Sequence, residues 1–481
     1  MPDLPDGEEP YLVCLGGTSE IGASCHYLNI DGTGIMLDAG ADPEGEGMDS
    51  VPDLNYLVDR ADTGVDHVLV SHAHQDHLGS LPVVIRTFPH VLVHMTRATR
   101  DLANILLPSS ARLQVRKLQE GSSTSKPLFD ADELDAYEYL YLAHHLEMPF
   151  DLTGIRGRTP VTGRLFDAGH VLGAMGVEID VEAEDENDEP RRVFYTSDTS
   201  LQPQGIIPGG SYPDGPIDTL ILESTLGADA DAENYTRKSE ERRLGEALKE
   251  TLERGGTALL PVFALGRSQE VLAMIDRYKR RGIIDEDTPV YSAGMMRAIS
   301  DVYDRTRYTT PRLNAEFEVY GVEQKRLPRG QNGLTRALAE PGILVVGSGM
   351  MFERTISNKL AQEMVGDAKN AVLLVGYARE DSPAARLLEA EGEGDDRQVI
   401  LDDARGPQPL RCTVGRFRFS GHSHRRDLLD LVERLAPKRI ILVHGETVAK
   451  TWMADNIKFF HPHIEIVTPT QGERVSLFSD A

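Results

Sequence analysis

Short apolar runs recur along the 481-residue chain, and most of them end in glycine or in polar residues. Between residues 11 and 40 such runs are separated by Gly16-Gly17 and Asp31-Gly32, which predicts strands joined by turns. Residues 67–70 predict another buried strand. From residue 255 onward, apolar runs alternate with amphipathic stretches, which favours a parallel sheet with crossover helices. The pattern therefore predicts an α/β fold with more than one domain.

Side chains capable of chemistry follow several of these predicted strands. Asp38 follows the strand that ends at Leu37, and Asp198 follows Val193-Phe194-Tyr195 with only two residues between. His170 comes after Phe166-Asp167-Ala168-Gly169. An acid at a strand end is often only a turn former, and a lone histidine after glycine is usually structural. Asp38, Asp198 and the histidine-rich stretch after residues 67–70 each follow a predicted strand, and these three strand ends predict one rim of a sheet that carries a site.

The densest cluster is the stretch SHAHQDHLGS, which follows the strand predicted at 67–70 and contains His72, His74, Asp76 and His77. Imidazoles together with a carboxylate suit zinc and similar divalent ions. His72 and His74 alternate on an extended segment, so both can face one ion. The alternative is a polar loop that caps a helix. These four residues cannot complete two metal sites, so further ligands such as His170 are needed.

Charge and composition restrict the class of protein. The net charge is −27, from 50 basic and 77 acidic residues. Only 11 of the basic residues are lysine, which predicts adaptation to a salt-rich cytosol, although an ordinary acidic protein is the alternative. No apolar run approaches ~18 residues, and no signal sequence or Cys-x-x-Cys pair is present. We expect a cytoplasmic protein with reduced thiols and no membrane association.

The C-terminal part holds a local basic cluster in this acidic chain. Arg416, Arg418 and Ser420 alternate with Phe417 and Phe419, which predicts a half-buried strand. The cluster stands beside Gly421-His422, and contacts with a phosphate backbone are favoured over a solvated face. A weaker phosphate signal is the glycine-flanked Ser348 with Gly349. Glu223 and His444 each follow an apolar strand.

In order and context, these residues resemble the motifs of a known family. Asp38, the run from His72 to His77, His170 and Asp198 resemble those of the metallo-β-lactamase superfamily. Glu223, His422 and His444 are similar to the additional motifs of its β-CASP branch of nucleic-acid-processing nucleases. The segments LGGTSEIGASC, AGHVLGA, ESTLG, LLPVFALGRSQE and SGMM resemble the archaeal and eukaryotic cleavage and polyadenylation specificity factor nucleases, with archaeal RNase J as a neighbour.

The resemblance implies a fold and a division of the chain. It implies an αββα metallo-β-lactamase domain over residues 1–222, an inserted β-CASP domain over 223–409 and a C-terminal return to the first domain over 410–481. The active site is then expected in the cleft between the two domains.

The resemblance also implies two Zn²⁺ ions and assigns their ligands. One ion is held by His72, His74 and His170, the other by Asp76, His77 and His444, and Asp198 bridges them. Asp38 is expected to orient a ligand or a water. His422 is expected to be the general acid, with its pKa raised by Glu223, although phosphate binding without proton transfer is the alternative.

The function implied is a zinc-dependent ribonuclease that hydrolyses RNA phosphodiester bonds, with endonucleolytic action in mRNA 3′-end processing or RNA decay. Single-stranded RNA is the expected partner, and a homodimer is compatible with the sequence. The alternatives are a 5′–3′ exoribonuclease of RNase J type, a non-catalytic RNA-binding scaffold and a small-substrate hydrolase. The complete ligand set disfavours the scaffold, and the inserted domain disfavours the small-substrate hydrolase.

Overall fold

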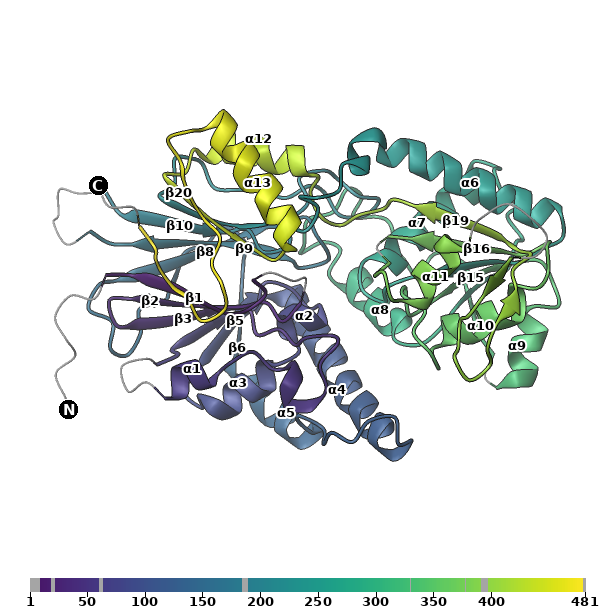
Figure 1. The fold of residues 1–481 in the computed structure, drawn as a ribbon, viewed down its shortest axis with the longest axis horizontal. Coiled ribbons are helices and arrows are strands. Elements are labelled where there is room, and N and C mark those ends of the chain that lie inside the picture. The colour runs from purple at the N-terminus through teal and green to yellow at the C-terminus, as the bar shows by residue number, and fades with distance from the viewer. Residues whose placement is uncertain are drawn as a thin grey trace. The chain divides into compact units, whose positions relative to one another are not determined.

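A computed structural model describes residues 9–18, 22–59, 64–183, 189–328, 330–376, 378–390 and 397–478 (Figure 1). The chain divides into two compact units. The first comprises Met1–Gln202, Gly209–Ala230 and His422–Ala481, and the second comprises Pro203–Pro208 and Asp231–Gly421. Among the described residues, no helix combines the length and the apolar character that crossing a membrane requires.

The first unit is built on two seven-stranded sheets. The order in one sheet is β22 (Arg474–Ser476), β1 (Tyr11–Gly16), β2 (Cys25–Ile30), β3 (Thr33–Leu37), β4 (His67–Leu69), β5 (Leu92–Thr96) and β6 (Tyr141–His144). The order in the other is β21 (Glu465–Val467), β20 (Arg439–Val443), β11 (Thr219–Glu223), β10 (Arg191–Tyr195), β9 (Met175–Val181), β8 (Val161–Asp167) and β7 (Phe150–Asp151).

The two sheets pack face to face and helices cover their outer faces (Figure 1). Alternate residues of β10, such as Val193 and Tyr195, point into the core between the sheets, whereas Phe194 packs outward. The outward face of the second sheet packs against α12 (Arg425–Leu435) and α13 (Thr447–Phe460). The remaining helices of this unit are α1 (Asn55–Val58), α2 (Gln75–Leu78), α3 (Leu81–Thr87), α4 (Arg97–Gln119) and α5 (Ala131–Tyr137). This αββα arrangement confirms the predicted fold class.

The direction of the strands brings the candidate residues together. Strands β3 and β4 are parallel, so Asp38 and the segment from Ser71 leave the first sheet at the same edge. Strands β10, β11 and β20 are also mutually parallel, and they deliver Asp198, Glu223 and His444 at one edge of the second sheet. The prediction of a single sheet rim was therefore wrong, because both sheets of the sandwich contribute.

The second unit contains a six-stranded parallel sheet with the order β14 (Lys325–Arg326), β13 (Val290–Ser292), β15 (Ile343–Val346), β12 (Ala258–Pro261), β16 (Ala371–Val375) and β19 (Thr413–Phe417). Its helices are α6 (Arg237–Glu253), α7 (Arg267–Arg280), α8 (Met296–Arg305), α9 (Gln331–Ala337), α10 (Ile356–Met364) and α11 (Pro383–Glu389). A two-stranded sheet joins β17 (Gln398–Val399) to β18 (Gln408–Pro409). The alternation of strands and helices agrees with the predicted crossover pattern.

The limits of the units differ from the predicted domain limits at 222/223 and 409/410. The chain changes unit at 230/231 and again at 421/422. The predicted return began at residue 410, but β19 pairs in parallel with β16 from Ala371↔Thr413 to Val375↔Phe417 and so belongs to the sheet of the second unit. Residues 1–8 of the predicted first domain lie outside the described residues.

Candidate metal centre

The histidine-rich stretch starts in extended conformation and ends in a short helix. His72 and His74 precede α2, whereas Asp76 and His77 are on it. His74 occupies the N-cap position with extended φ and ψ, but its side chain makes no capping hydrogen bond. The helix-capping alternative therefore does not explain this residue. The side chains of His72 and His77 are fully buried.

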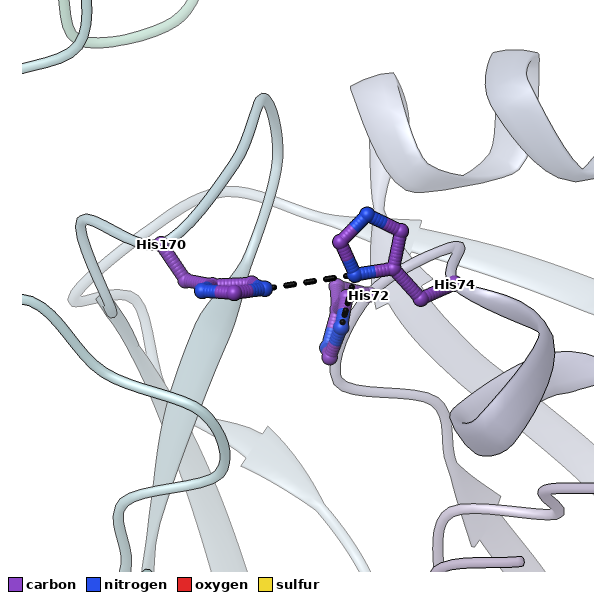
Figure 2. A group of neighbouring side chains, drawn as sticks. All are labelled: His72, His74 and His170. Atoms are coloured by element: carbon purple, nitrogen blue, oxygen red, sulfur yellow. Dashed lines mark hydrogen bonds between the residues drawn. The ribbon is translucent and has the colours of Figure 1, made fainter. Parts of the chain in front are cut away.

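Three imidazoles converge beside this stretch. The distance from Nδ1 of His74 is 3.1 Å to Nε2 of His72 and 3.2 Å to Nε2 of His170 (Figure 2). Nitrogen ligands that sit ~2.0–2.1 Å from a tetrahedral zinc ion are roughly 3.3 Å apart. The three nitrogens are therefore spaced as ligands of one ion would be.

A second group of possible ligands comprises Asp76, His77 and His444, whose ligand atoms lie within 4.8 Å of one another. Nε2 of His77 lies 3.3 Å from a carboxylate oxygen of Asp198, and Nε2 of His444 lies 3.7 Å from one of Asp76. Both nitrogens are buried, and neither approach has hydrogen-bond geometry. A divalent cation between these groups would satisfy them, because borderline cations prefer imidazole and carboxylate ligands.

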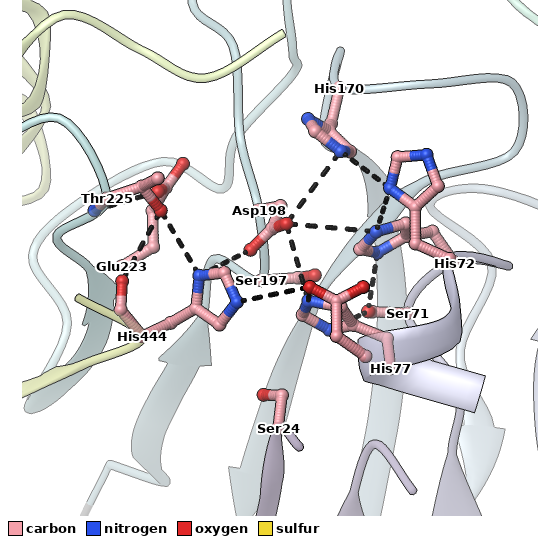
Figure 3. A network of polar contacts seen from close by, with 12 residues as sticks. Ser24, Ser71, His72, His77, His170, Ser197, Asp198, Glu223, Thr225 and His444 are labelled. Atoms are coloured by element: carbon pink, nitrogen blue, oxygen red, sulfur yellow. Dashed lines mark hydrogen bonds and ion pairs between the residues drawn. The ribbon is translucent and has the colours of Figure 1, made fainter. Parts of the chain in front are cut away.

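Asp198 lies between the two groups (Figure 3). Its Oδ2 is 3.8 Å from Nε2 of His72 and 3.3 Å from Nε2 of His77, while its Oδ1 is 3.1 Å from Nδ1 of His444. It is thus the only carboxylate within 4.0 Å of imidazoles from both groups among the described residues that form them. The position is that of a bridging ligand, and the residues present fit two divalent ions.

The electrostatics of the centre follow from burial and from these carboxylates. Burial opposes charge on His77, but Asp198, Asp38 and Asp76 outweigh it and raise the pKa of that imidazole well above its usual range. Burial, reinforced by the neighbouring imidazoles, lowers the pKa of His72 well below its usual range. Burial would raise the pKa of Asp198, but the surrounding histidines, His444 first, hold it well below its usual range. The negative charge concentrated here suits a cation.

Asp38 lies behind the ligands rather than among them. Its Oδ1 accepts from the backbone N–H of Ser71 at 2.7 Å. Its Oδ2 accepts from Ser71 Oγ at 2.9 Å, from His77 Nδ1 at 2.8 Å and from the Tyr195 hydroxyl at 2.8 Å. With Nδ1–H donating to Asp38, the other nitrogen of His77 keeps its lone pair directed at the centre. This geometry agrees with the expectation that Asp38 orients a ligand.

Three residues of the centre have left-handed backbone conformation. The φ angles are +62° for Asp38, +52° for Ser197 and +47° for His444. Such a conformation costs a non-glycine residue roughly 1–2 kcal/mol. The cost is incurred where the chain turns sharply out of β3, β10 and β20, and these turns place the side chains at the centre.

Glu223 and His422 form a pair at the side of this centre. His422 Nδ1 lies 3.2 Å from Oε2 and 3.3 Å from Oε1 of Glu223, and its ring centroid is 4.6 Å from that of His170. The Glu223 side chain also accepts from the backbone N–H of Thr199 at 2.8 Å. Burial disfavours the imidazolium, but the carboxylates of Glu223 and Asp198 outweigh it and raise the pKa of His422 to about 9. A pKa in this range favours the protonated imidazole at neutral pH.

Three contacts of the centre involve residues that the sequence did not identify. Besides the bonds to Asp38, the Ser71 hydroxyl lies 3.1 Å from Nδ1 of His72, and Thr225 Oγ1 lies 3.1 Å from Nδ1 of His444 (Figure 3). Tyr195 reaches Asp38 from the other sheet. The only available signal was proximity in sequence, since Ser71 precedes His72 and Tyr195 stands three residues before Asp198.

A second cluster of histidines lies elsewhere in the first unit. His67 Nδ1 is 2.9 Å from His94 Nε2, and His94 Nδ1 is 2.9 Å from His144 Nε2. The ring of Phe150 stacks on His144 at a centroid distance of 3.9 Å. His144 ends strand β6, which extends the sheet beyond β5.

The predicted RNA-contact residues belong to the second unit. Ser348 and Gly349 follow β15, whereas Arg416 lies on β19 and Arg418 and Ser420 follow it. Because all strands of this sheet are parallel, both segments lie at its carboxyl edge. The Arg416 side chain is exposed. Arg418 lies 3.5 Å from Asp231 and donates its backbone N–H to Glu240 at 2.8 Å.

Comparison with known families matches three parts of the chain. Residues 19–179 match the metallo-β-lactamase superfamily, residues 268–387 match the Beta-Casp domain, and residues 407–469 match the Zn-dependent metallo-hydrolase RNA specificity domain.

The chain is also similar to characterised proteins. It is 31% identical to endoribonuclease YSH1 of Saccharomyces cerevisiae, over 90% of this chain and 54% of that protein, and 30% identical to YSH1 of Eremothecium gossypii with the same coverage. It is 29% identical to transcription termination factor FttA of Methanothermobacter thermautotrophicus, over 98% of this chain and 72% of that protein. The chain spans about half the length of the YSH1 relatives.

A similar solved structure is the crystal structure of a protein of unknown function from Enterococcus faecalis. The TM-score is 0.54 at 14% identity, with 98% of this chain and 100% of that chain covered. At this identity the likeness supports the fold.

Proposed function

The chain belongs to the metallo-β-lactamase superfamily and carries its β-CASP and RNA-specificity domains, and from this we propose that it is a metal-dependent ribonuclease that hydrolyses phosphodiester bonds in single-stranded RNA. The observation that carries the proposal is the position of Asp198, within 4.0 Å of imidazoles from both candidate ligand groups. A carboxylate shared in this way is typical of centres that hold two ions.

The proposed ligands divide as their positions suggest. His72, His74 and His170 would hold one zinc ion, Asp76, His77 and His444 would hold the other, and Asp198 is placed to reach both groups. When bound, the two ions lower the pKa of water towards neutrality and neutralise charge on the phosphate under attack. The chain's part is to fix these side chains before substrate binds. Asp38 contributes by accepting from His77 at 2.8 Å.

His422 is the proposed general acid. A leaving 3′ or 5′ oxygen of RNA needs a proton, and His422 carries one at neutral pH because Glu223 lies 3.2 Å from its Nδ1. Glu223 is itself held by the Thr199 N–H, so the pair keeps one orientation. The Nε2–H of His422 is the proposed proton donor to the leaving oxygen. Arg416, Arg418, Ser420, Ser348 and Gly349 are proposed contacts for RNA phosphates.

Endonucleolytic cleavage in RNA 3′-end processing or decay is the favoured mode. It is supported by the similarity to the YSH1 proteins, which are endoribonucleases. A 5′–3′ exoribonuclease is the second candidate. A non-catalytic scaffold is disfavoured, because all seven proposed ligand positions are occupied by residues able to bind metal. The three cysteines are free and buried, which supports a reducing compartment.

The test is cleavage of single-stranded RNA labelled at either end, at high salt. The wild-type protein should give end-labelled fragments of intermediate length from either label, whereas release of 5′ mononucleotides alone would show the exonucleolytic mode. His72→Ala should abolish cleavage. His145→Ala, which removes an exposed imidazole of the same unit, is the matched control and should cleave as the wild type does. Undiminished cleavage by His72→Ala would refute the proposal.

A further inference from the structure

One hydrogen bond joins the two sheets of the first unit directly behind the metal centre. Tyr195 is the last residue of β10 in the second sheet, and its hydroxyl donates to Oδ2 of Asp38 at 2.8 Å. Asp38 directly follows β3 of the first sheet. Both side chains are buried, at 2% and 0% exposure. The bond therefore crosses the sandwich at the edge where the proposed ligands gather.

The proposed ligands come from both sheets, so a hydrogen bond between the sheets can keep the two sets of ligands in register. His72, His74, Asp76 and His77 leave the first sheet after β4, whereas His170, Asp198 and His444 follow strands of the second. Apolar packing between sheets is non-directional and tolerates small shifts, but the ligands of one ion must keep their distances within about 0.2 Å. A hydrogen bond with defined length and angle can hold the two edges in one relation.

The Tyr195 hydroxyl also acts on two of the proposed ligands through short paths. Asp38 Oδ2, its acceptor, also accepts from Nδ1 of His77. On its other side, the hydroxyl lies 3.5 Å from Ser24 Oγ, and the Ser24 backbone N–H donates to the carbonyl of Asp76 at 2.8 Å. His77 and Asp76 belong to the same proposed ion. The path to the other ion is longer, because it runs from Asp38 through Ser71 to His72.

The hydroxyl is suited to this role because it stays a donor. Burial and then the Asp38 carboxylate raise the pKa of Tyr195 well above its usual range. A buried carboxylate needs its full set of donors, and Oδ2 of Asp38 has three, from Tyr195, His77 and Ser71. Without the tyrosine hydroxyl, Oδ2 keeps only the donors from His77 and Ser71, Oδ1 keeps the Ser71 N–H, and among the described residues no hydrogen bond from the second sheet then holds Asp38.

We propose that Tyr195 is a positioning residue of the metal centre, which fixes Asp38 and through it His77, so that its loss weakens chiefly the ion held by Asp76, His77 and His444. The inference rests on the metal centre of the proposed function, but it does not depend on RNA being the substrate. Its test therefore reads metal affinity and leaves activity aside.

The test is Tyr195→Phe, which removes one oxygen atom and keeps the ring. Tyr141→Phe is the matched control, since Tyr141 is buried in β6 of the same unit and its hydroxyl makes no hydrogen bond among the described residues. Zinc affinity is measured by chelator competition, and Co²⁺ absorption reports each site separately. Loss of a direct hydrogen-bond partner of a metal ligand typically costs ~10–100-fold in affinity, and Tyr195 acts one contact further out through Asp38, so a loss of about 10-fold or less is expected. We expect that loss for one ion of Tyr195→Phe, an unchanged second ion, and two unchanged ions in Tyr141→Phe.

A second variant separates positioning from a general loss of structure. In an Asp38→Asn background, Tyr195→Phe should cause little further loss of affinity, because both changes break the same path. Thermal unfolding of the metal-free proteins should give similar midpoints for Tyr195→Phe and Tyr141→Phe. The proposal is overturned if Tyr195→Phe binds both ions as the wild type does, if both ions weaken equally, or if the effects of Tyr195→Phe and Asp38→Asn add in full. Zinc binding with no RNA cleavage would instead count against the proposed function alone.

Discussion

The first unit contains two groups of buried and partly buried histidines, and they are arranged differently. In the candidate metal centre, nitrogens of His72, His74 and His170 converge, with 3.1 and 3.2 Å separating two pairs. In the second group, His67, His94 and His144 form a line in which His94 uses one ring nitrogen for each neighbour, at 2.9 Å in both cases. The first arrangement leaves a common point for a cation, whereas the second pairs its nitrogens with one another.

Carboxylates account for the rest of the difference. Asp198, Asp38 and Asp76 surround His77 and raise the pKa of its imidazole above its usual range despite burial. In the line of three, burial dominates and lowers the pKa of each histidine, that of His94 to about 2. A buried histidine cluster therefore indicates a metal site only when its nitrogens converge and acids accompany them. Each prediction below tests one side of this contrast.

The largest effect is expected from removing a converging histidine. His72→Ala should lose zinc and reduce RNA cleavage far beyond the ~10–100-fold that an indirect contact costs. His94→Gln, from the line of three, should keep its zinc and its activity but lose about 1–3 kcal/mol of stability, because hydrogen-bond partners of His94 are left unsatisfied. Elemental analysis and urea unfolding of both variants check this. Zinc loss in His94→Gln would remove the distinction between the groups.

The next effect concerns the proton that His422 is proposed to give. His422→Asn should keep its zinc and lose about 10²–10⁴-fold in the cleavage rate constant under single-turnover conditions. An RNA with sulfur in place of the leaving oxygen needs no such proton, so the loss should largely disappear on that substrate. An equal loss on both substrates would assign His422 to phosphate binding. Glu223→Gln should show a weaker form of the same pattern.

A smaller effect is expected in the pH dependence of stability. His94 has a pKa of about 2 when folded against 6.5 as a free side chain, so the unfolded chain binds a proton that the folded chain excludes. The contribution of His94 to the free energy of unfolding is unaffected above pH 6.5. Below pH 6.5 the free energy of unfolding falls by ~1.4 kcal/mol for each pH unit. Between pH 7 and 5, metal-free wild type should lose about 2 kcal/mol more than His94→Gln. Parallel curves would show that His94 can be protonated in the folded state.

The smallest effect is expected in RNA binding, from an arginine on strand β19 of the second unit. Arg416→Ala should weaken RNA binding a few-fold and reduce the slope of log affinity against log salt by about 0.7, the value for one phosphate contact with a single strand. Arg405→Ala, an exposed arginine of the same unit paired with Glu363, serves as the control. Filter binding over a salt series measures both. Equal slopes for the two variants would leave Arg416 as a solvated surface residue.

Most residues of the centre could be predicted from the sequence, because ligand types and strand ends are local features. The run from His72 to His77 and the acids after β3 and β10 could be identified one by one. Whether side chains from distant strands converge depends on the tertiary fold, so the sequence did not predict that both sheets contribute. The role of the Tyr195 hydroxyl was missed because the strand pattern treats this position only as apolar. Strand β19 was assigned to the wrong unit because its apolar alternation does not specify which sheet pairs with it.

The most direct test of the metal-centre account is to measure zinc and RNA cleavage in one preparation while the metal is withdrawn and restored. The account predicts two zinc ions per chain, cleavage that is lost as a chelator removes them, and recovery when Zn²⁺ is added back to the wild type but not to His72→Ala. Cleavage that persists in zinc-free protein, or a wild-type protein that binds no divalent ion, would contradict it.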